Sequence, residues 1–391
     1  MLSSTPSHRA HPHRGASAQP IVQPVVQPAV QPAVQPVVQI VQHLQPGGLE
    51  TMVLNLTQAS PAEQPVHIIS LEGRKGDVLR AWPALHPFAG NIHCLEKPAG
   101  WSLATLWRLT RLLRQLKPVA VHTHHLGPML YGGLASRLAR VPTLVHTEHD
   151  AWYLDDPHQR TLALWGLRAF KPILVADATP VANQLLAKLG QLSPTVIPNG
   201  IDELRFAPGA AALARQEIGL PQGVKLIGCA ARLESVKGHT LLLEAIRALP
   251  QEVHLALAGV GSLQNALQQQ CQQLGIAHRV HFLGLVENMP RFYQGLDLFC
   301  LPSLAEGMPL CVLEAQACGV PVVMSDVGAA REIVCQASGH ILSERDPGRL
   351  AQLLAQGLLQ CHSLRAVTRE FVCQQSSLSR MAQAYQQLYS R

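Results

Sequence analysis

Short apolar runs of strand type alternate with amphipathic stretches of helix type along most of the chain, and this alternation limits the fold more than any other feature. A strand followed by a helix normally returns to a parallel neighbour, so the pattern predicts an α/β fold with helices covering parallel sheets. A connector, ELRFAPGAAALARQEIGLPQG, separates two series of such units. We therefore expect two Rossmann-like, doubly wound domains, residues 37–200 and 201–370.

The length of 391 residues agrees with two domains. Ligands of doubly wound sheets bind beyond the carboxyl ends of the strands, so we expect the two domains to face each other across a cleft. The loops that follow strands are then the candidates for function. The strand-like runs are VVQIVQHL, PVHIISL, VAVHTHH, TLVHTEH, PILVADA and TVIPNGID in the first series, and VKLIGCAARL, VHLALAGVG, VHFLGLV, LDLFCLPS and VPVVMSD in the second.

The first 36 residues do not follow this pattern. Proline recurs at every fourth position in QPIVQPVVQPAVQPAVQPVVQ, which excludes helix and central strand and predicts extended, polyproline-like or disordered chain. Such a tail is either a passive spacer or an arm that docks a partner, and its composition leaves both open. At the other end, FVCQQSSLSRMAQAYQQLYSR predicts a last helix over residues 371–391.

Composition narrows the class of protein. The net charge of +6 is mild for this length, the basic residues are scattered and aromatic residues make up only 4%, which argues against nucleic acid as a partner. Nine isolated cysteines, without CxxC pairs, indicate reduced thiols in a cytoplasmic protein. No run approaches the roughly 18 apolar residues of a membrane span, and the N-terminus lacks the apolar segment of a secretory signal.

Two loops after expected strands are suited to an anionic ligand. PGGLE contains Gly47 and Gly48, which let backbone N–H groups approach a phosphate, although a tight turn would have the same sequence. RLESVKG places Arg232 and Lys237 at the end of a second-domain strand, where two cations could hold a diphosphate, although a solvated loop is the simpler reading. GVGSLQ lacks the third glycine of a dinucleotide fingerprint, so we interpret it as a turn and expect no cofactor.

The loop EGMPLCVLE presents a conflict, because it has two acids, Glu306 and Glu314, at a strand–turn–helix junction. Free N–H groups and the helix dipole normally attract anions to such a junction. A carboxylate only accepts hydrogen bonds, so a ligand rich in hydroxyl groups would suit both acids. The phosphates of the same ligand would then need other partners, such as Arg232 and Lys237.

Histidines gather at the ends of two first-domain strands. A His-x-His pattern suggests a metal site, which Glu148 or Asp150 could complete. Neighbouring residues on a strand point to opposite faces, however, so we favour a single histidine that hydrogen-bonds a substrate. The histidines are His122, His124 and His125 in VHTHH, and His146 and His149 in VHTEHD.

Taken together and in this order, the segments GGLE, TEHD, VIPNGID, ARLESVKG, AGVGSL, FLGLV and LDLFCLPSLAEGMPLCVLEAQACGVPVVMSDVGAAREIV resemble the family 4 retaining glycosyltransferases of the GT-B fold (glycosyl transferases group 1). The resemblance covers about residues 37–391, and residues 297–334 are its most specific part. The tail lies outside it. LVADA departs from the family pattern, which often has a serine where Ala176 and Asp177 stand.

The resemblance implies a nucleotide-diphosphate sugar as the donor, held mostly by the second domain, and a last helix that crosses back to the first. Glu306 would lie beside the donor sugar, and His149 would be the histidine near it, with His146 as a rival. Glu314 would accept hydrogen bonds from the ribose. The remaining donor-binding positions would be Gly47, Gly48, Arg232, Lys237, Val286, Gly307, Met308, Pro309 and Leu310.

The resemblance also implies chemistry without a metal, because fixed cations and helix N–H groups can stabilise the leaving diphosphate. The expected activity is transfer of a hexose, with retention, to a hydroxyl of a carbohydrate or lipid-linked acceptor in polysaccharide or glycolipid biosynthesis. A sugar-nucleotide epimerase of the same fold and a non-catalytic scaffold protein are the alternatives. The stretch WRLTRLLRQLK, with four basic residues beside an apolar stripe, is either an interfacial membrane helix or an ordinary surface helix, so peripheral contact with the inner membrane surface stays open.

Overall fold

We describe a computed structural model of the chain, which covers residues 35–190 and 192–391. The tail predicted over residues 1–36 lies outside the described residues apart from Gln35 and Pro36. The described residues from 35 onward belong to one compact unit.

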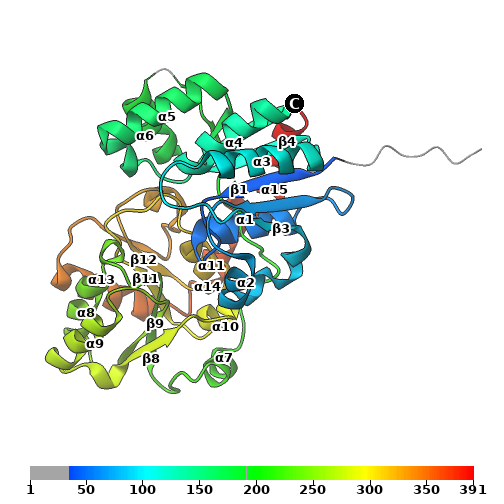
Figure 1. The fold of residues 1–391 in the computed structure, drawn as a ribbon. Coiled ribbons are helices and arrows are strands. Elements are labelled where there is room, and N and C mark those ends of the chain that lie inside the picture. Colours follow the sequence, from blue (N-terminus) through cyan, green and yellow to red (C-terminus); the bar gives the residue numbers. More distant parts are fainter. Residues whose placement is uncertain (1–34, 191) are drawn as a thin grey trace, which may run out of the picture. The chain divides into compact units, whose positions relative to one another are not determined.

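Two all-parallel sheets, as predicted, organise the described residues (Figure 1). The first has the strand order β3-β2-β1-β4-β5-β6-β7 and the second β10-β9-β8-β11-β12-β13. The strands of the first sheet are β1 Val37–Val41, β2 Val66–Ser70, β3 Ile92–Cys94, β4 Ala120–His124, β5 Thr143–Glu148, β6 Ile173–Ala176 and β7 Thr195–Val196. Those of the second are β8 Lys225–Ala230, β9 Val253–Ala258, β10 Val280–Gly284, β11 Leu298–Leu301, β12 Val322–Ser325 and β13 His340–Leu342.

Each sheet has one point at which the strand order reverses, between β1 and β4 in the first sheet and between β8 and β11 in the second. The loops after these strands diverge, and open α/β sheets bind their ligands at this switch point. The fold therefore selects the loops after β1, β4, β8 and β11 as candidates on topology alone.

Helices connect the strands and cover the sheets. The first domain has α1 Gly48–Gln58, α2 Lys75–Ala81, η1 Pro83–Asn91, α3 Leu103–Leu116, α4 Leu126–Ala139, η2 Trp152–Asp155, α5 Pro157–Phe170 and α6 Thr179–Leu189. The second part of the chain has α7 Ala211–Glu217, η3 Ser235–Lys237, α8 His239–Arg247, α9 Gln264–Gln273, η4 Ala277–Arg279, α10 Met289–Gln294, α11 Leu310–Ala317, α12 Ala330–Ile333, α13 Pro347–Gln360, α14 Arg365–Gln375 and α15 Leu378–Tyr389.

Local sequence sets several helix ends. Side chains of Ser102, Asp156 and Asp346 accept hydrogen bonds from the first-turn N–H groups of α3, α5 and α13, which would otherwise have no partner. Proline follows the cap in α5 and α13, where its missing N–H costs nothing. No helix among the described residues is long and apolar enough to cross a membrane.

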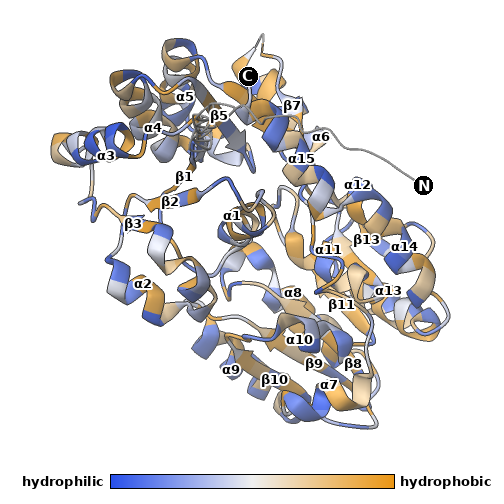
Figure 2. Cartoon of the chain, turned by 90° about the vertical axis from the view of Figure 1, so that its right-hand side faces the viewer, coloured by the Kyte–Doolittle hydropathy of each residue, from blue (hydrophilic) through white to orange (hydrophobic). Residues whose placement is uncertain are grey.

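The central strands of the first sheet have two different faces. Val38 and Ile40 of β1 pack with Val121 of β4 against α3 and α4. Because side chains alternate along a strand, Gln39 and His122 lie on the opposite face, where both hydrogen-bond to α15. Figure 2 shows orange along the strands of the second sheet, whereas α3 carries both orange and blue residues.

The end of the chain differs from the sequence prediction. Residues 371–391 were expected to form one helix, but α14 ends at Gln375 and α15 begins at Leu378. Between them the backbone pairs with Ile201, whose N–H donates to the carbonyl of Ser376 (2.9 Å) and whose carbonyl accepts from the N–H of Leu378 (3.0 Å). This short bridge interrupts the helix, and α15 then packs against α1 and β5 of the first domain.

Candidate active site

Lys237 and Glu306 form an ion pair between two switch-point loops of the second domain. The ammonium of Lys237, in the short 3₁₀ helix after β8, lies 2.7 Å from Oε1 of Glu306, which follows β11. Both side chains are largely buried. The structure thus brings together two residues that the sequence assigned to different parts of one donor molecule, the diphosphate and the sugar.

Glu314 lies in the second turn of α11, while Glu306 lies four residues before this helix begins. Tyr293 of α10 donates a hydrogen bond from its hydroxyl to Oε2 of Glu314 (2.7 Å). Burial raises the pKa of Glu314, and the hydrogen bond from Tyr293 opposes this shift. The other carboxylate oxygen of Glu314 has no hydrogen-bond partner among the described residues and can accept from a ligand hydroxyl.

Gly307 lies directly against the first domain. A Cβ at this position would overlap the backbone carbonyl of His149, so only glycine allows the two loops to approach this closely. The next residue is also held from the first domain, because the side chain of Asn199 donates to the carbonyl of Met308 (3.0 Å). The loop after β11 therefore contacts both the loop after β5 and the segment after β7.

Both ring nitrogens of His149 have partners inside the first domain. Nδ1 lies 3.3 Å from Oδ2 of Asp177, and Nε2 lies 3.1 Å from Nδ1 of His124. Asn199 donates to the same oxygen of Asp177 (3.2 Å). His149 is therefore held from two sides, and its carbonyl is the part that meets Gly307.

His146 lies on the face of β5 opposite to Thr147 and is fully buried. Its Nδ1 is 3.0 Å from the hydroxyl of Thr123, and its Nε2 is 3.0 Å from Oε1 of Glu148, which also accepts a hydrogen bond from Tyr153. Burial opposes ionisation of Glu148, but His146 beside it and these hydrogen bonds lower its pKa below the usual value. His146 and Glu148 thus form an internal pair beneath the site.

The glycine loop after β1 carries an acid of its own. Gly47 precedes α1 and Gly48 is its first residue, and a Cβ at position 47 would overlap the side chain of Glu50. The carboxylate of Glu50 is nearly buried, lies 3.3 Å from Nδ1 of His43, and has its pKa raised by burial. Arg232 from the second domain is among the charges that oppose this shift. The loop that the sequence assigned to phosphate therefore lies within electrostatic reach of the proposed phosphate-binding arginine.

Asp150, next to His149, has a pKa well above its usual range. Burial raises its pKa to about 7, with the neighbouring carboxylates of Glu148, Asp177 and Glu306 adding to the effect and His149 opposing it. A pKa in this range lets Asp150 change its charge close to neutral pH.

The other positions named from the sequence lie in loops after second-domain strands or at the start of α11. Arg232 is exposed in the turn after β8, and Val286 is half-buried in the loop after β10. Pro309 is the residue before α11, and Leu310 is its first residue, so the N–H groups at the start of this helix follow Glu306 directly.

A metal site made from the histidines is not supported by the geometry of the described residues. His122 and His124 share one face of β4, whereas His146 and Glu148 bond to each other on the other face of β5. In the described part of the chain, Asp297, Cys361 and His362 are the group whose ligand atoms come close enough for a cation. Asp297 precedes β11, at the end of the strand opposite to the candidate site, and Arg215 already pairs with it at 2.9 Å.

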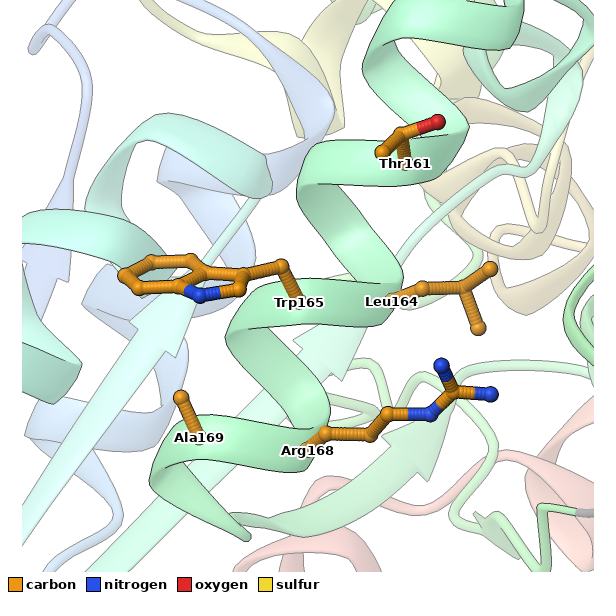
Figure 3. A pocket seen from close by; sticks show the side chains of 5 residues that line it. All are labelled: Thr161, Leu164, Trp165, Arg168 and Ala169. Carbon is orange, nitrogen blue, oxygen red and sulfur yellow. The ribbon is translucent and has the colours of Figure 1, made fainter.

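Two surface hollows lie outside this constellation. One is a shallow depression on the outer face of α5, where the side chains of Trp165, Leu164 and Arg168 project from the helix (Figure 3). The other is a groove between α1, the segment 202–204 and α15, with Gln39, Tyr385 and Tyr389 among its lining residues.

Asp177 and Asn199 belong to the site although the sequence did not predict a role for either. Each follows a first-domain strand, β6 or β7, and each is buried. Polar residues directly after strands were the available signal, and VIPNGID contains Asn199. The unexpected Asp177 in LVADA has a structural explanation, because it anchors His149.

Two Rossmann-like domains, each with a parallel sheet whose strand order reverses once, define a class of fold, GT-B. The solved structure of Anabaena HepE in complex with UDP-glucose has this fold and superposes with a TM-score of 0.79 over 91% of this chain and 99% of that chain, at 21% identity. That likeness establishes the fold.

The family follows from two sequence models, one for each domain. Residues 46–205 match "Glycosyltransferase Family 4" and residues 212–370 match "Glycosyl transferases group 1". The chain belongs to this glycosyltransferase family, as the sequence resemblance indicated.

Two characterised relatives differ in the sugar that they transfer. The chain is 30% identical over 243 residues to UDP-Gal:alpha-D-GlcNAc-diphosphoundecaprenol alpha-1,3-galactosyltransferase of Escherichia coli, covering 58% of this chain and 62% of the relative. It is 37% identical over 167 residues to the lipopolysaccharide core biosynthesis mannosyltransferase LpsB of Rhizobium meliloti, covering 40% and 48%. The chain thus spans less than two thirds of the length of each.

Proposed function

We propose that this chain is a retaining glycosyltransferase that moves a sugar from a nucleotide-diphosphate sugar to a hydroxyl acceptor. The observation that carries the proposal is the ion pair of Lys237 and Glu306 at the switch point of the second sheet, next to the contact of Gly307 with the His149 loop after β5. In this reading, residues 37–200 form the acceptor side and residues 201–370 bind the donor. The C-terminal segment, 371–391, returns to the first domain.

The donor sites follow from charge and hydrogen-bonding capacity. Lys237 and the exposed Arg232, which forms no ion pair with the described residues, bind the diphosphate. The N–H groups of Gly307, Met308 and Leu310 contribute at the start of α11. Glu314 accepts from the ribose, and Glu306 lies at the sugar. Val286 lies by the nucleobase. Gly47 and Gly48 close on the diphosphate from the first domain.

His149 rather than His146 is the site histidine in this proposal. His146 is buried and hydrogen-bonded to Thr123 and Glu148. The His149 loop, in contrast, contacts the loop after β11 at Gly307. Because both nitrogens of His149 have partners within the first domain, we assign it a positional role at the donor sugar, through its ring and its carbonyl.

Retention follows from attack on the same face of the sugar that the diphosphate leaves. The acceptor oxygen forms the new bond to the anomeric carbon, the bond from that carbon to the leaving phosphate breaks, and the acceptor proton moves to the leaving phosphate. Lys237, Arg232 and the helix N–H groups stabilise the charge that builds up on this phosphate. These fixed cations are the reason why we propose that transfer needs no divalent metal.

A lipid-linked acceptor at the cytoplasmic face of a membrane is the proposed setting. The E. coli relative acts, by its name, on a diphosphoundecaprenol acceptor. All nine cysteines are free, which agrees with a reducing compartment. Helix α3 exposes Trp107 and Leu103 beside Arg108 and Arg111, and α5 exposes Trp165 beside Arg168, a combination suited to a headgroup layer (Figure 3).

The test is a donor screen followed by a transfer assay. Thermal shifts with UDP-, GDP- and ADP-sugars select the donor, and its hydrolysis or transfer is then measured for the wild type, Glu306→Ala and the exposed control Glu344→Ala. We expect loss of activity in Glu306→Ala alone, with folding unchanged, and activity that persists in EDTA. Full activity of Glu306→Ala would refute the site, and a strict divalent requirement would refute the metal-free mechanism.

The same assay separates the alternatives. Interconversion of the donor sugar without an acceptor would identify an epimerase. Absence of donor binding and turnover with every nucleotide sugar would identify a scaffold protein.

A further inference from the structure

A continuous chain of buried hydrogen bonds runs from His149 to the C-terminal helix. His149 is 3.1 Å from His124, and His124 is 2.8 Å from the side-chain oxygen of Gln39. The amide nitrogen of Gln39 donates to the hydroxyl of Tyr389 on α15 (3.1 Å). The chain thus joins β4, β1 and α15, whose linked residues are up to 350 positions apart.

A branch continues away from the site. The hydroxyl of Tyr389 lies 2.8 Å from Nδ1 of His122, whose Nε2 is 2.7 Å from the hydroxyl of Thr147. Thr147 in turn lies 3.0 Å from the hydroxyl of Tyr385, one helical turn before Tyr389.

Nothing in the fold alone requires polar residues at these positions. Gln39, His122, His124 and Thr147 are each at most 1% exposed and occupy alternate positions on three adjacent central strands, where apolar side chains would pack as well. A buried polar network is costly unless every member is satisfied, and here it ends on a residue of the candidate site.

The direction of the hydrogen bonds follows from the amide of Gln39. Burial lowers the pKa of His124 well below its usual value, so its ring is neutral and has one donor and one acceptor. Because Gln39 presents its oxygen, His124 must donate from Nε2 and accept at Nδ1, and it can then accept only from an N–H at Nε2 of His149. Tyr389 supports this amide orientation, because its oxygen accepts from the amide nitrogen of Gln39, which leaves its hydrogen available to Nδ1 of His122 at 2.8 Å.

We propose that Tyr389 of the C-terminal helix is a positioning residue that, through Gln39, fixes the tautomer of His124 and thereby holds the ring orientation of His149. This role rests on the function proposed above. Without the Tyr389 hydroxyl, the amide of Gln39 can turn to donate to His124, which reverses the tautomer of His124 and withdraws the acceptor from His149. The loop that meets Gly307 then loses one of its two ring anchors.

The experiment compares Tyr389→Phe with Tyr385→Phe in the full chain. Both remove one buried hydroxyl from the same face of α15, but Tyr385 lies at the far end of the branch, so its loss leaves the links from Tyr389 to His149 intact. Histidine ring ¹⁵N NMR of selectively labelled protein reports which ring nitrogens of His124 and His149 carry a proton without substrate, and His149→Gln identifies the His149 signals. Steady-state kinetics with the selected donor gives kcat and KM separately.

We expect Tyr389→Phe to change the ring-nitrogen signals of His124 and His149 and to lower kcat roughly 10-fold, with donor KM nearly unchanged, because a displaced positioning group acts mainly on the reacting geometry. Tyr385→Phe should leave both readouts near wild type, and Gln39→Glu, which keeps an oxygen toward His124, should preserve the His124 tautomer. Unchanged histidine signals in Tyr389→Phe, or equal effects of both tyrosine variants, would overturn the proposal. If the wild type shows no transfer, the proposed function fails, and the NMR comparison still decides on the relay.

Discussion

Lys237 and Glu306 are bonded to each other at 2.7 Å, although each is assigned to a different part of the donor. When the donor binds, Lys237 must either contact the diphosphate and Glu306 together or break its ion pair with Glu306. The pair therefore keeps each charge compensated in the empty site, since an unpaired, largely buried charge is unfavourable.

We expect the two residues to be energetically coupled and the donor to weaken that coupling. Lys237→Met and Glu306→Gln should each lower the free energy of unfolding. The double variant should lose less than the sum of the two single losses, and the difference, the coupling energy, should be about 1–2 kcal/mol. A double-mutant cycle by urea unfolding, with and without UDP, measures this. Strict additivity without ligand would show that the pair contributes nothing.

The contact between Gly307 and the carbonyl of His149 gives the next prediction. Gly307→Ala should push the two loops apart and reduce transfer by about 100-fold, because the misplacement lies at the reacting geometry. Gly76→Ala is the matched control, since a Cβ there meets nothing within 4 Å and alanine favours the helix α2. Activity assays and thermal unfolding of both variants test this, and a fully active Gly307→Ala would contradict the contact.

The strand and helix alternation predicted most of the fold because each unit repeats a period that sequence displays directly. Two edge strands, β3 and β13, were not predicted, because three residues are too short to show any period. The break between α14 and α15 was missed for a different reason. It depends on Ile201, whose backbone pairs with residues some 175 positions later, and no local pattern encodes such a contact.

The site was predictable where chemistry is carried by neighbours in sequence, as in the loop from Glu306 to Glu314. The residues that hold the side chains of this site in place were not predictable. Asp177 and Tyr389 reach the His149 network from another strand end and from the last helix, and only tertiary structure places them there. The two acids lie in different local structures, because α11 begins at Leu310 and contains Glu314 but not Glu306.

Asp150 should make stability depend on pH. Its pKa is raised from 3.8 to about 7, so the folded state binds a proton more tightly than the unfolded state. The resulting stabilisation is lost as pH rises from about 4 to about 7. Asp150→Asn does not titrate and should gain stability relative to the wild type between pH 5 and pH 8, by about 1–3 kcal/mol after allowance for solvent screening.

Urea unfolding at pH 5 and pH 8 measures this difference, with the exposed Glu344→Gln as the control. A constant difference between Asp150→Asn and the wild type across this range would show that Asp150 titrates normally.

The exposed face of α3 gives the last prediction. Trp107 is 61% exposed and stacks with the guanidinium of Arg111, while Leu103 is 81% exposed, so apolar and basic groups share one surface of the helix. Such a surface can bind at the headgroup layer of a membrane. Each basic residue near anionic lipid adds about 1 kcal/mol to the binding free energy. Trp107→Ser combined with Arg111→Ser should weaken sedimentation with phosphatidylglycerol vesicles about 10-fold, and wild-type binding should fall with salt. Leu359→Ser on α13, which removes an even more exposed apolar side chain from the second domain, is the control. Equal vesicle binding by all three proteins would mean that α3 is an ordinary surface helix, the alternative that its sequence also allowed.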